Sequence, residues 1–265
     1  YSYRRDCSLG NSGKCSRRYG WRGHSFHHHA RSRFISLSYP SELDIFNMPY
    51  LFDNLNQVYK VLDGEIGQSA FAGLENQGLK VLGFFDLGFR NMTNNLRPIK
   101  APSDCTGLRM RTLQSAVCVE GLNMFGIDAV SMSFGELFTA LQTGAIDGQE
   151  NPISVIDASQ FYSVQKYLSL TEHIYPVLPV MISTSTFNNL TSEQQALVLE
   201  CVADTVTFQR EANAANYDSE LEDLTQNGMS VNEVDKSAFK QVVEPLYEKY
   251  NAKWGEAIAE IQAMA

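Results

Sequence analysis

The hydrophobic and polar positions of this chain change their spacing many times, and each change marks the border of a short structural element. Apolar and β-branched runs bounded by glycine, proline or asparagine predict strands. The predicted strands are LKVLGFF at 79–85, Phe89–Asn94, LRMRT at 108–112, DAVSM at 128–132, AIDGQ at 145–149 and residues 179–184. Between 108 and 149 strands alternate with helix-length segments, which indicates a parallel sheet flanked by helices.

Helical periodicity and capping signals account for most of the remaining chain. The predicted helices cover residues 54–64, 65–76, 115–126, 133–144, 157–168, 191–228, 236–250 and 251–263. Asp53 is positioned to cap the first of them, and Ser133 with Glu136 has the spacing of a capping box. The helix that follows Thr191 keeps an apolar stripe as far as Gly228, a length of roughly 55 Å. We expect a helix of this length to cross two lobes.

Charge divides the chain into two unequal parts. Of the 21 Lys and Arg residues, eight lie in residues 1–40, which hold only one of the 30 Asp and Glu residues. Residues 1–40 also lack the periodicity of a helix or a strand, so we expect a basic, disordered segment. Such a segment can bind nucleic acid or an anionic membrane, but the acidic remainder does not favour nucleic-acid binding.

Composition sets further limits on the function. The chain is 44% hydrophobic and 19% charged, as ordinary globular proteins are. It contains neither an uninterrupted apolar run of about 18 residues nor the apolar core of a signal peptide. The five cysteines fit no zinc spacing, and the histidine triplet at 27–29 has no spaced metal-binding partners. We therefore expect free thiols and neither a metal nor another cofactor.

The most informative candidate residues are Arg111 and Asn151. Both lie where predicted strands end, and ligands of open α/β sheets collect beyond the carboxyl ends of the strands. A guanidinium group grips a carboxylate through two parallel hydrogen bonds, and an amide can donate to the same group. Arg109 lies two residues before Arg111 on the same strand, and Arg111 is nearer the end of that strand, so we expect Arg111 to be the one that points into the site. The pattern predicts a binding site for a small anion.

Two further residues are weaker candidates for this site. Arg90 precedes Arg111 by 21 residues at the end of a predicted strand, where it would suit a dianion or a carboxylate with polar neighbours. Phe134 begins a predicted helix and can either stack against the ligand or lie in the core. Neither residue identifies the site by itself.

An enzymatic alternative rests on Asp147 and Glu150. They could act as an acid and a base on a small organic acid, although no nucleophile, histidine base or metal cluster accompanies them. Hydrogen bonding to the backbone, or a role in holding the lobe together, is the simpler interpretation of both carboxylates. His173 could line a pocket, but a histidine of the core or of a hinge is the simpler interpretation there.

Four segments of the chain resemble those of a known family. They are DIFNMPYLF, GFRNMTNNLRPIKAPSD with GLRMRT two residues later, MSFGELFTALQTGAIDGQENP, and FYSVQKYLSLTEH. They resemble the solute-binding proteins of TRAP transporters, in the dicarboxylate-binding family, over roughly residues 41–265. Such proteins work in the periplasm of Gram-negative bacteria, where they capture organic acids for a membrane permease driven by a sodium gradient, without catalysis.

The resemblance implies two α/β lobes around a central cleft, joined by hinge strands and a long helix that spans both lobes. Lobe I would comprise residues 41–87 and 177–215, and lobe II would comprise residues 88–176 and 216–265 with the C-terminal helices. The ligand would be a small organic acid. The partners would be the TRAP membrane subunits and not nucleic acid, and the protein would be a monomer.

The resemblance also implies roles for single residues. Arg111 would pair with the ligand carboxylate, Asn151 would contact the same carboxylate, Arg90 would be a second, frequently used arginine, and Phe134 would be an aromatic residue of the pocket. Residues 1–40 depart from the family pattern. The departure fits a shifted reading frame over residues 14–40 and a truncated start, so lobe I is expected to be incomplete.

Overall fold

The computed structural model describes residues 43–265, which belong to one compact unit, Tyr39–Ala265. The histidine triplet and the basic segment of residues 1–40 lie outside the described residues. Eight strands form two sheets within the described part of the chain. The strands are β1 (Leu79–Phe85), β2 (Arg90–Asn94), β3 (Arg109–Thr112), β4 (Asp128–Ser131), β5 (Gly148–Pro152), β6 (Tyr167–Ile174), β7 (Leu178–Ser183) and β8 (Ser230–Glu233).

The larger sheet has six strands in the order β4-β3-β5-β2-β6-β8. β3 is parallel to both β4 and β5, and β6 is parallel to β8, whereas β2 is antiparallel to β5 and to β6. The sheet is therefore mixed, and the expectation of a parallel sheet holds for β3, β4 and β5. β2 lies outside the segment for which a parallel sheet was expected, and it runs against both of its neighbours.

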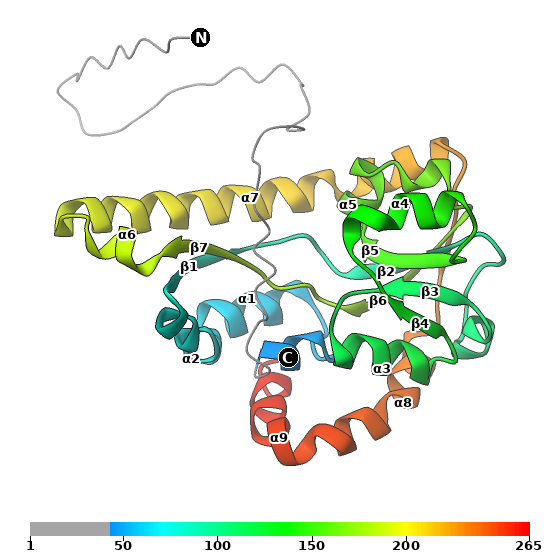
Figure 1. Cartoon of the computed structure of the whole chain (residues 1–265), viewed down its shortest axis with the longest axis horizontal. Helices are drawn as coiled ribbons and strands as arrows, with labels where there is room; N and C mark the ends of the chain where they lie inside the picture. Colours follow the sequence, from blue (N-terminus) through cyan, green and yellow to red (C-terminus); the bar gives the residue numbers. More distant parts are fainter. Residues whose placement is uncertain (1–42) are drawn as a thin grey trace, which may run out of the picture. The chain divides into compact units, whose positions relative to one another are not determined.

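Helices cover both faces of the larger sheet (Figure 1). They are α3 (Ala116–Met124), α4 (Phe134–Gln142), α5 (Ile153–Ala158) and α8 (Lys236–Val242). One face packs around Met92, Met110 and Phe239, and the other face packs around Leu137, Ile156 and Leu168. A sheet covered on both faces leaves ligand access at its edges, where the strands end.

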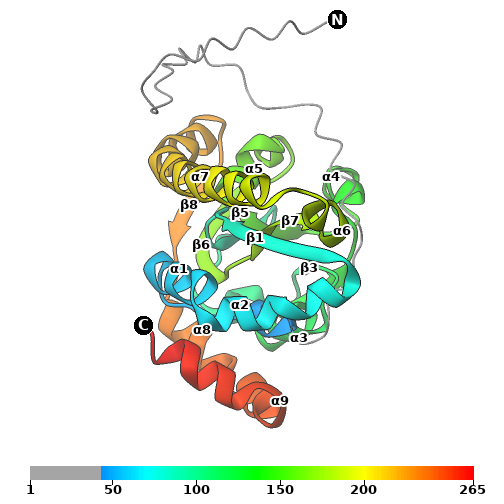
Figure 2. The same cartoon turned by 90° about the vertical axis from the view of Figure 1, so that its left-hand side faces the viewer.

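The smaller sheet consists of β1 and β7, paired antiparallel. Val202 and Val206 of helix α7 (Ser192–Gln226) pack against Gly83 of β1, and helices α1 (Leu55–Asp63) and α2 (Glu65–Ala72) lie on the other side of the strand (Figure 2). The core beneath joins Phe46, Val58 and Phe84 to Trp254 of α9 (Glu244–Gln262). Segments far apart in the sequence thus form this core.

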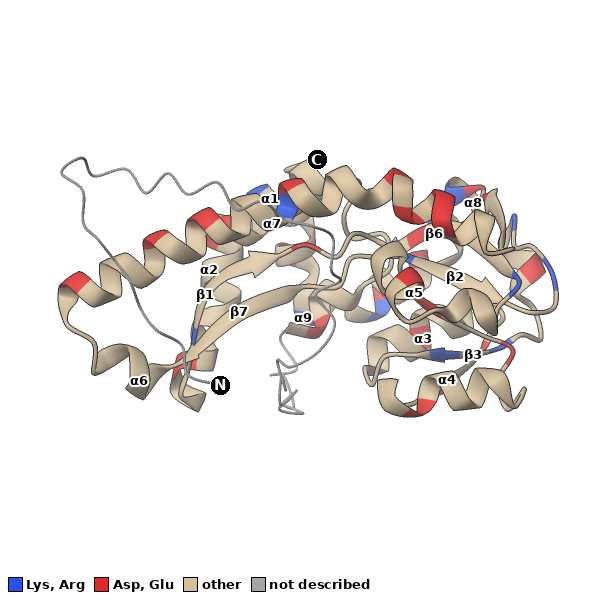
Figure 3. Ribbon diagram, turned by 90° about the horizontal axis from the view of Figure 1, so that it is seen from above, with Lys and Arg blue, Asp and Glu red and all other residues tan. Residues whose placement is uncertain are grey.

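Helix α7 confirms the predicted long helix. Its 35 residues run from the β1–β7 sheet to α5, and acidic side chains recur along it (Figure 1, Figure 3). Thr191 and Gln194 form the expected capping box. The backbone amide of Gln194 donates to Oγ1 of Thr191 at 3.3 Å, and the backbone amide of Thr191 donates to Oε1 of Gln194 at 2.9 Å. Neither α7 nor any other helix among residues 43–265 has the length and apolar character needed to cross a membrane.

Short helical segments complete the described chain. They are the 3-10 helices Leu43–Asn47, Gly73–Gln77, Pro102–Cys105 and Phe161–Ser163, together with α6 (Thr184–Asn188). The second predicted helix is therefore divided, because α2 ends at Ala72 and a 3-10 turn follows. Cys105, Cys118 and Cys201 are free thiols, as expected for these three cysteines.

Several predicted elements are wrong in detail. The helix expected at 157–168 is instead the end of the short α5, a 3-10 turn and the start of β6, a strand that is buried on both faces and includes the polar residues Ser169 and Thr171. Strand β8 was not predicted, and AIDGQ contributes only its last two residues to β5. Asn54 and not Asp53 caps α1, accepting from the Gln57 amide at 3.0 Å. The last two helices meet at Val243 and not at residue 250.

Candidate ligand-binding site

The predicted site residues converge on one edge of the larger sheet. β3 and β5 are parallel neighbours, and β2 runs antiparallel beside β5, so the ends of β3 and β5 meet the beginning of β2. Arg111 lies near the end of β3, Asn151 lies near the end of β5, and Arg90 begins β2 opposite Pro152. Three candidates from distant parts of the sequence therefore share this edge.

Arg111 is a buried cation with an unused donor. Its residue is 3% exposed, and its Nε donates to the carbonyl oxygen of Met132 at 2.9 Å. Its Nη1 is buried and has no hydrogen-bond partner among the described residues. Burial lowers the pKa of Arg111, an effect that Glu150 opposes and Arg90 reinforces. Buried donors are normally satisfied, and a carboxylate would satisfy this one with a charge-assisted bond.

Phe134 covers the guanidinium of Arg111. The centre of its ring lies 6.0 Å from Cζ of Arg111 and 6.1 Å from the ring of Phe161. Phe134 is the first residue of α4 and is 49% exposed, so it does not belong to the buried core. Of the two possibilities left open for this residue, its exposure rules out the core, and a place at the site stays a prediction. Ser133 precedes it and donates from its hydroxyl to the Glu136 carboxylate at 2.5 Å, but neither side-chain-to-backbone hydrogen bond of the expected capping box is formed.

Asn151 is held at the start of a chain of buried polar groups. Its amide donates to Oε1 of Gln149, whose own amide donates to Oγ1 of Thr93 at 2.9 Å. Thr93 in turn donates to Oε1 of Gln165 at 2.9 Å, and Gln165 donates to the carbonyl oxygen of Val164 at 3.0 Å. Each group has a defined direction of donation, so the chain fixes the orientation of the Asn151 amide.

Arg90 has a different environment from Arg111. It forms an ion pair through Nε with Glu150, and its Nη2 donates to Oε1 of Glu150 at 3.0 Å and to the Glu150 carbonyl oxygen at 2.5 Å. Thr112 also donates to Oε1 of Glu150 at 2.9 Å, and Nε2 of His173 lies 3.5 Å from Oε2. Glu150 and His173 are fully buried, so His173 belongs to the core.

The ionisation of Glu150 follows from these contacts. Burial acts to raise its pKa, but Arg90 and His173 together outweigh burial and lower it to about 2. Glu150 is therefore an anion at neutral pH. A carboxylate that stays ionised and paired is a poor general base, because it is neither free to accept a proton nor matched to neutral pH.

Asp147 does not face Glu150. It precedes β5, its Oδ2 accepts from the backbone amide of Arg109 at 2.8 Å, and its amide donates to the Arg109 carbonyl oxygen at 2.7 Å. Arg109 begins β3, so this contact lies at the opposite end of the strands from Glu150. Both carboxylates have structural partners, and the geometry gives no support to an acid–base pair.

Arg109 is excluded from the site by the same geometry. Its side chain is 56% exposed, and its Nε lies 3.6 Å from Oδ2 of Asp128 on β4. Of the two arginines of β3, Arg111 is the buried one, and its place at the site stays a prediction.

Sequence reasoning missed the residues that support the site. Gln149, Thr93 and Gln165 orient Asn151, and Glu150 neutralises Arg90. The alternation of Gln149 and Asn151 along β5 was a usable signal, since residues two apart on a strand share a face. The pairing of Glu150 with Arg90 had no local signal, because the two residues lie on neighbouring strands that are 60 residues apart in the sequence.

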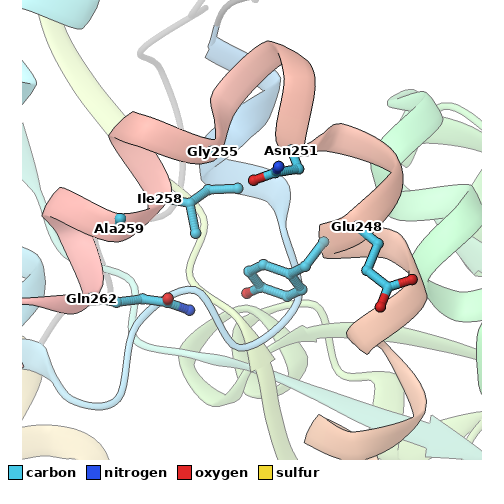
Figure 4. Close-up of a pocket in the computed structure, with 7 residues that line it drawn as sticks. Glu248, Asn251, Gly255, Ile258, Ala259 and Gln262 are labelled. Carbon is cyan, nitrogen blue, oxygen red and sulfur yellow. The ribbon is translucent and has the colours of Figure 1, made fainter.

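A separate groove of about 430 Å³ lies along α9 (Figure 4). It is lined by Tyr247, Glu248, Asn251, Gly255, Ile258, Ala259 and Gln262. None of the predicted site residues lines it, and it has an acidic but no basic lining residue. It is therefore not a candidate for the anion site. The described residues also contain no group of three or more His, Cys, Asp or Glu side chains that could hold a metal ion.

Comparison with known proteins places the chain in a family. Residues 27–253 match the bacterial extracellular solute-binding proteins, family 7, also called DctP. The chain belongs to this family. The match confirms the resemblance found in the sequence and begins earlier than the expected residue 41. The enzymatic alternative gains no support from a family of solute-binding proteins.

Individual relatives of this DctP-family chain include proteins with named ligands. The 2,3-diketo-L-gulonate-binding periplasmic protein of Escherichia coli K12 is 34% identical over 76% of this chain and 62% of its own length. A TRAP periplasmic solute-binding protein of Polaromonas sp. JS666, bound to D-erythronate, is 37% identical with a TM-score of 0.82, over 85% of this chain and 75% of that one.

A third relative, a TRAP periplasmic solute-binding protein of Sulfurospirillum deleyianum DSM 6946 with bound succinate, is 27% identical. It superposes with a TM-score of 0.80 over 86% of this chain and 76% of that one. These two-lobe structures confirm the expected α/β binding-protein fold. The chain itself spans 62% of the length of the Escherichia coli relative.

Proposed function

We propose that this chain is an extracytoplasmic solute-binding protein that captures a small organic acid through its carboxylate. The observation that carries the proposal is Arg111, a buried cation whose Nη1 has no partner among the described residues and whose guanidinium is covered by Phe134. Asn151 lies near the end of β5, the strand beside β3, at the same edge of the sheet. It would contact the same carboxylate. The named ligands of the relatives support this class, since they are organic acids.

In this proposal the protein works in the periplasm of a Gram-negative bacterium, as a monomer, and delivers its ligand to the membrane subunits of a sodium-coupled TRAP transporter. Family membership supports the location and the transporter. Catalysis has no part in the proposal, because Glu150 is held by Arg90 and Asp147 is held by the backbone of Arg109.

The ligand would be held by closure of two lobes, lobe I of residues 41–87 and 177–215 and lobe II of residues 88–176 and 216–265. The two connections between the sheets support these boundaries: the chain leaves β1 at Phe85 for β2 and leaves β6 at Ile174 for β7. A ligand stabilises the closed state by its greater affinity for that state.

The proposal is tested by thermal shift of the full chain with a panel of small organic acids at neutral pH. We expect at least one acid to raise the melting temperature of the wild type. Arg111→Met should abolish that increase, and Arg109→Gln, which removes an exposed arginine from the same strand, should retain it. An acid that stabilises wild type and Arg111→Met equally would overturn the assignment of Arg111, and a panel without any stabilising acid would overturn the function.

A further inference from the structure

The smaller and the larger sheet are joined by two short connections. Residues 86–89 lead from β1 to β2, and residues 175–177 lead from β6 to β7. Asp86 begins the first connection and is fully buried, and Tyr175 begins the second and is 2% exposed. A buried carboxylate is costly unless hydrogen bonds replace its contacts with water. The partners of Asp86 therefore decide how this group is tolerated.

The Asp86 carboxylate accepts four hydrogen bonds from neutral donors. Oδ1 accepts from the backbone amide of Gly88 at 2.8 Å and from the hydroxyl of Tyr175 at 2.9 Å. Oδ2 accepts from the hydroxyl of Tyr59 and from the side-chain amide of Asn213, both at 3.0 Å. A carboxylate has about four acceptor positions, so this one is saturated. Its donors come from both connections, from α1 and from α7.

The backbone of Asp86 is attached to the middle of α7. The side-chain amide of Gln209 accepts from the Asp86 amide at 2.8 Å and donates to the Asp86 carbonyl oxygen at 2.6 Å. Arg210 follows on the helix and donates to the carbonyl oxygen of Phe84 at 2.9 Å. Both connections between the sheets and the long helix therefore meet at Asp86.

The hydrogen bond between Asp86 and Tyr175 crosses the boundary between the two proposed lobes. Asp86 lies in lobe I, together with Tyr59, Gln209 and Asn213, whereas Tyr175 lies in lobe II. Among the described side chains that donate to Asp86, that of Tyr175 is thus the one that links the lobes. The bonds from Tyr59 and Asn213 hold the carboxylate within lobe I.

We propose that Asp86 couples the two connections, and that its hydrogen bond with Tyr175 restricts the lobes to one path of opening and closing. The inference rests on the proposed function, which requires two lobes that close on a ligand. Without this bond the unliganded protein has more arrangements of its lobes. A ligand that orders them then loses more conformational entropy, so its affinity falls although no group at the ligand changes. Asp86 and Tyr175 are positioning residues in this sense.

Two matched variants test the proposal, since each removes one hydroxyl donor from the same carboxylate and keeps the aromatic ring. Tyr175→Phe retains the edge contacts with Phe52 and Phe89, whose ring centres lie 6.1 and 5.5 Å away. Tyr59→Phe retains the stacking of Arg210 at 4.2 Å. We expect both variants to fold and to lose similar amounts of stability in urea unfolding. A difference between them in lobe motion or in binding then reports the connection and not the loss of a hydrogen bond.

The first measurement needs no ligand. Gln77→Cys in lobe I and Thr139→Cys in lobe II place one exposed spin label on each lobe. Cys7, Cys15 and Cys201 are replaced by serine in this protein, and the two remaining cysteines are buried. Pulsed electron paramagnetic resonance of the full chain gives the distribution of distances between the labels.

We expect the distribution of the unliganded protein to be about 1.5-fold broader or more in Tyr175→Phe, and to keep its wild-type width in Tyr59→Phe. An unchanged width in Tyr175→Phe, or equal broadening in both variants, would overturn this inference. Neither result would affect the proposed function, because no ligand is present.

The second measurement is calorimetric titration with D-erythronate and with succinate. For an acid that binds the wild type, we expect Tyr175→Phe to raise the Kd about threefold or more and Tyr59→Phe to leave it within about twofold. An equal increase in both variants would assign the loss to general destabilisation and would overturn this inference. Failure of the wild type to bind these or any other acid of the thermal-shift panel would overturn the proposed function, while the label distances would still decide the coupling at Asp86.

Discussion

Arg90 and Glu150, 60 residues apart in the sequence, form a fully buried ion pair in which the arginine also donates to the carbonyl oxygen of the glutamate. The pair joins neighbouring strands β2 and β5 at the edge where Arg111 and Asn151 lie. The two buried arginines therefore differ: Arg90 is neutralised within the protein, whereas Nη1 of Arg111 has no partner among the described residues.

The first prediction concerns the stability of the protein against acid. Glu150→Gln should lower the free energy of unfolding at neutral pH by about 3–5 kcal/mol, because it leaves Arg90 buried without its counterion. The folded-state pKa of Glu150, about 2, lies below its ordinary value of 4.5, so its stabilisation is present above that value and is lost as the pH falls toward 2. The difference in free energy of unfolding between wild type and Glu150→Gln should therefore shrink as the pH falls from 4.5 toward 2.

Urea unfolding of wild type and Glu150→Gln at neutral pH and at about pH 3 measures this effect. A deficit of the same size at both pH values would mean that the charge of Glu150 does not contribute in the way that its burial and partners indicate.

The second prediction separates two phenylalanines of α4. Phe134→Ala should raise the Kd for the ligand about three- to tenfold, because its ring covers the Arg111 guanidinium. Phe138→Ala is the matched control: Phe138 is 36% exposed and stacks on the same Phe161 ring, but the ring beside the Arg111 guanidinium is that of Phe134. Calorimetric titration of both variants with the acid found in the thermal-shift panel gives the comparison. An equal loss in both would assign the effect to α4 packing and not to the site.

The third prediction concerns Asp86, a fully buried carboxylate between β1 and β2. It accepts hydrogen bonds from the hydroxyls of Tyr59 and Tyr175 at 3.0 and 2.9 Å and from the Asn213 amide at 3.0 Å. Tyr175 lies between β6 and β7, so both connections between the two sheets meet at Asp86. Asp86→Ala should lower the free energy of unfolding by about 3 kcal/mol, because it leaves these donors without their acceptor.

The control for this change is Asp63→Ala. Asp63 is a half-exposed carboxylate of α1 that pairs with the largely buried Arg210 at 2.6 Å, and we expect this pair, which water reaches on the side of Asp63, to contribute about 1 kcal/mol. Chemical denaturation of both variants gives the two values. A loss in Asp86→Ala no larger than in Asp63→Ala would show that the buried carboxylate is not needed at the junction of the sheets.

The fourth prediction concerns Gly148, the first residue of β5. A Cβ atom at this position would lie 2.2 Å from the carbonyl oxygen of Thr93, so Gly148→Ala should force β2 away from β5. We expect this variant to yield no folded protein and therefore no ligand-induced stabilisation. At Gly135 in α4 a Cβ atom would meet no atom within 4 Å. Gly135→Ala should therefore leave stability unchanged or raise it by up to about 1 kcal/mol. Circular dichroism melts test both variants, and a Gly148→Ala protein that melts like wild type would contradict the clash.

Local chemistry explains which features could be predicted from the sequence. The β1 strand and the capping box of α7 depend on residues close together in the chain, and both are present in the structure. The family segments depend on local residue order in the same way. The helix expected at 157–168 is wrong because β6 is defined by its neighbours β2 and β8, which lie far from it in sequence.

The sequence by itself thus determined the α/β class and the family, and it predicted Arg111 as the arginine of the candidate site. Only the tertiary structure decided that Glu150 neutralises Arg90, that Asp147 lies at the opposite strand ends, and that Gln165 supports Asn151 through Thr93 and Gln149. The physical reason is that the charge available at a buried site depends on which side chains share it. That sharing is set by strand order and register, which bring together residues that the sequence keeps apart.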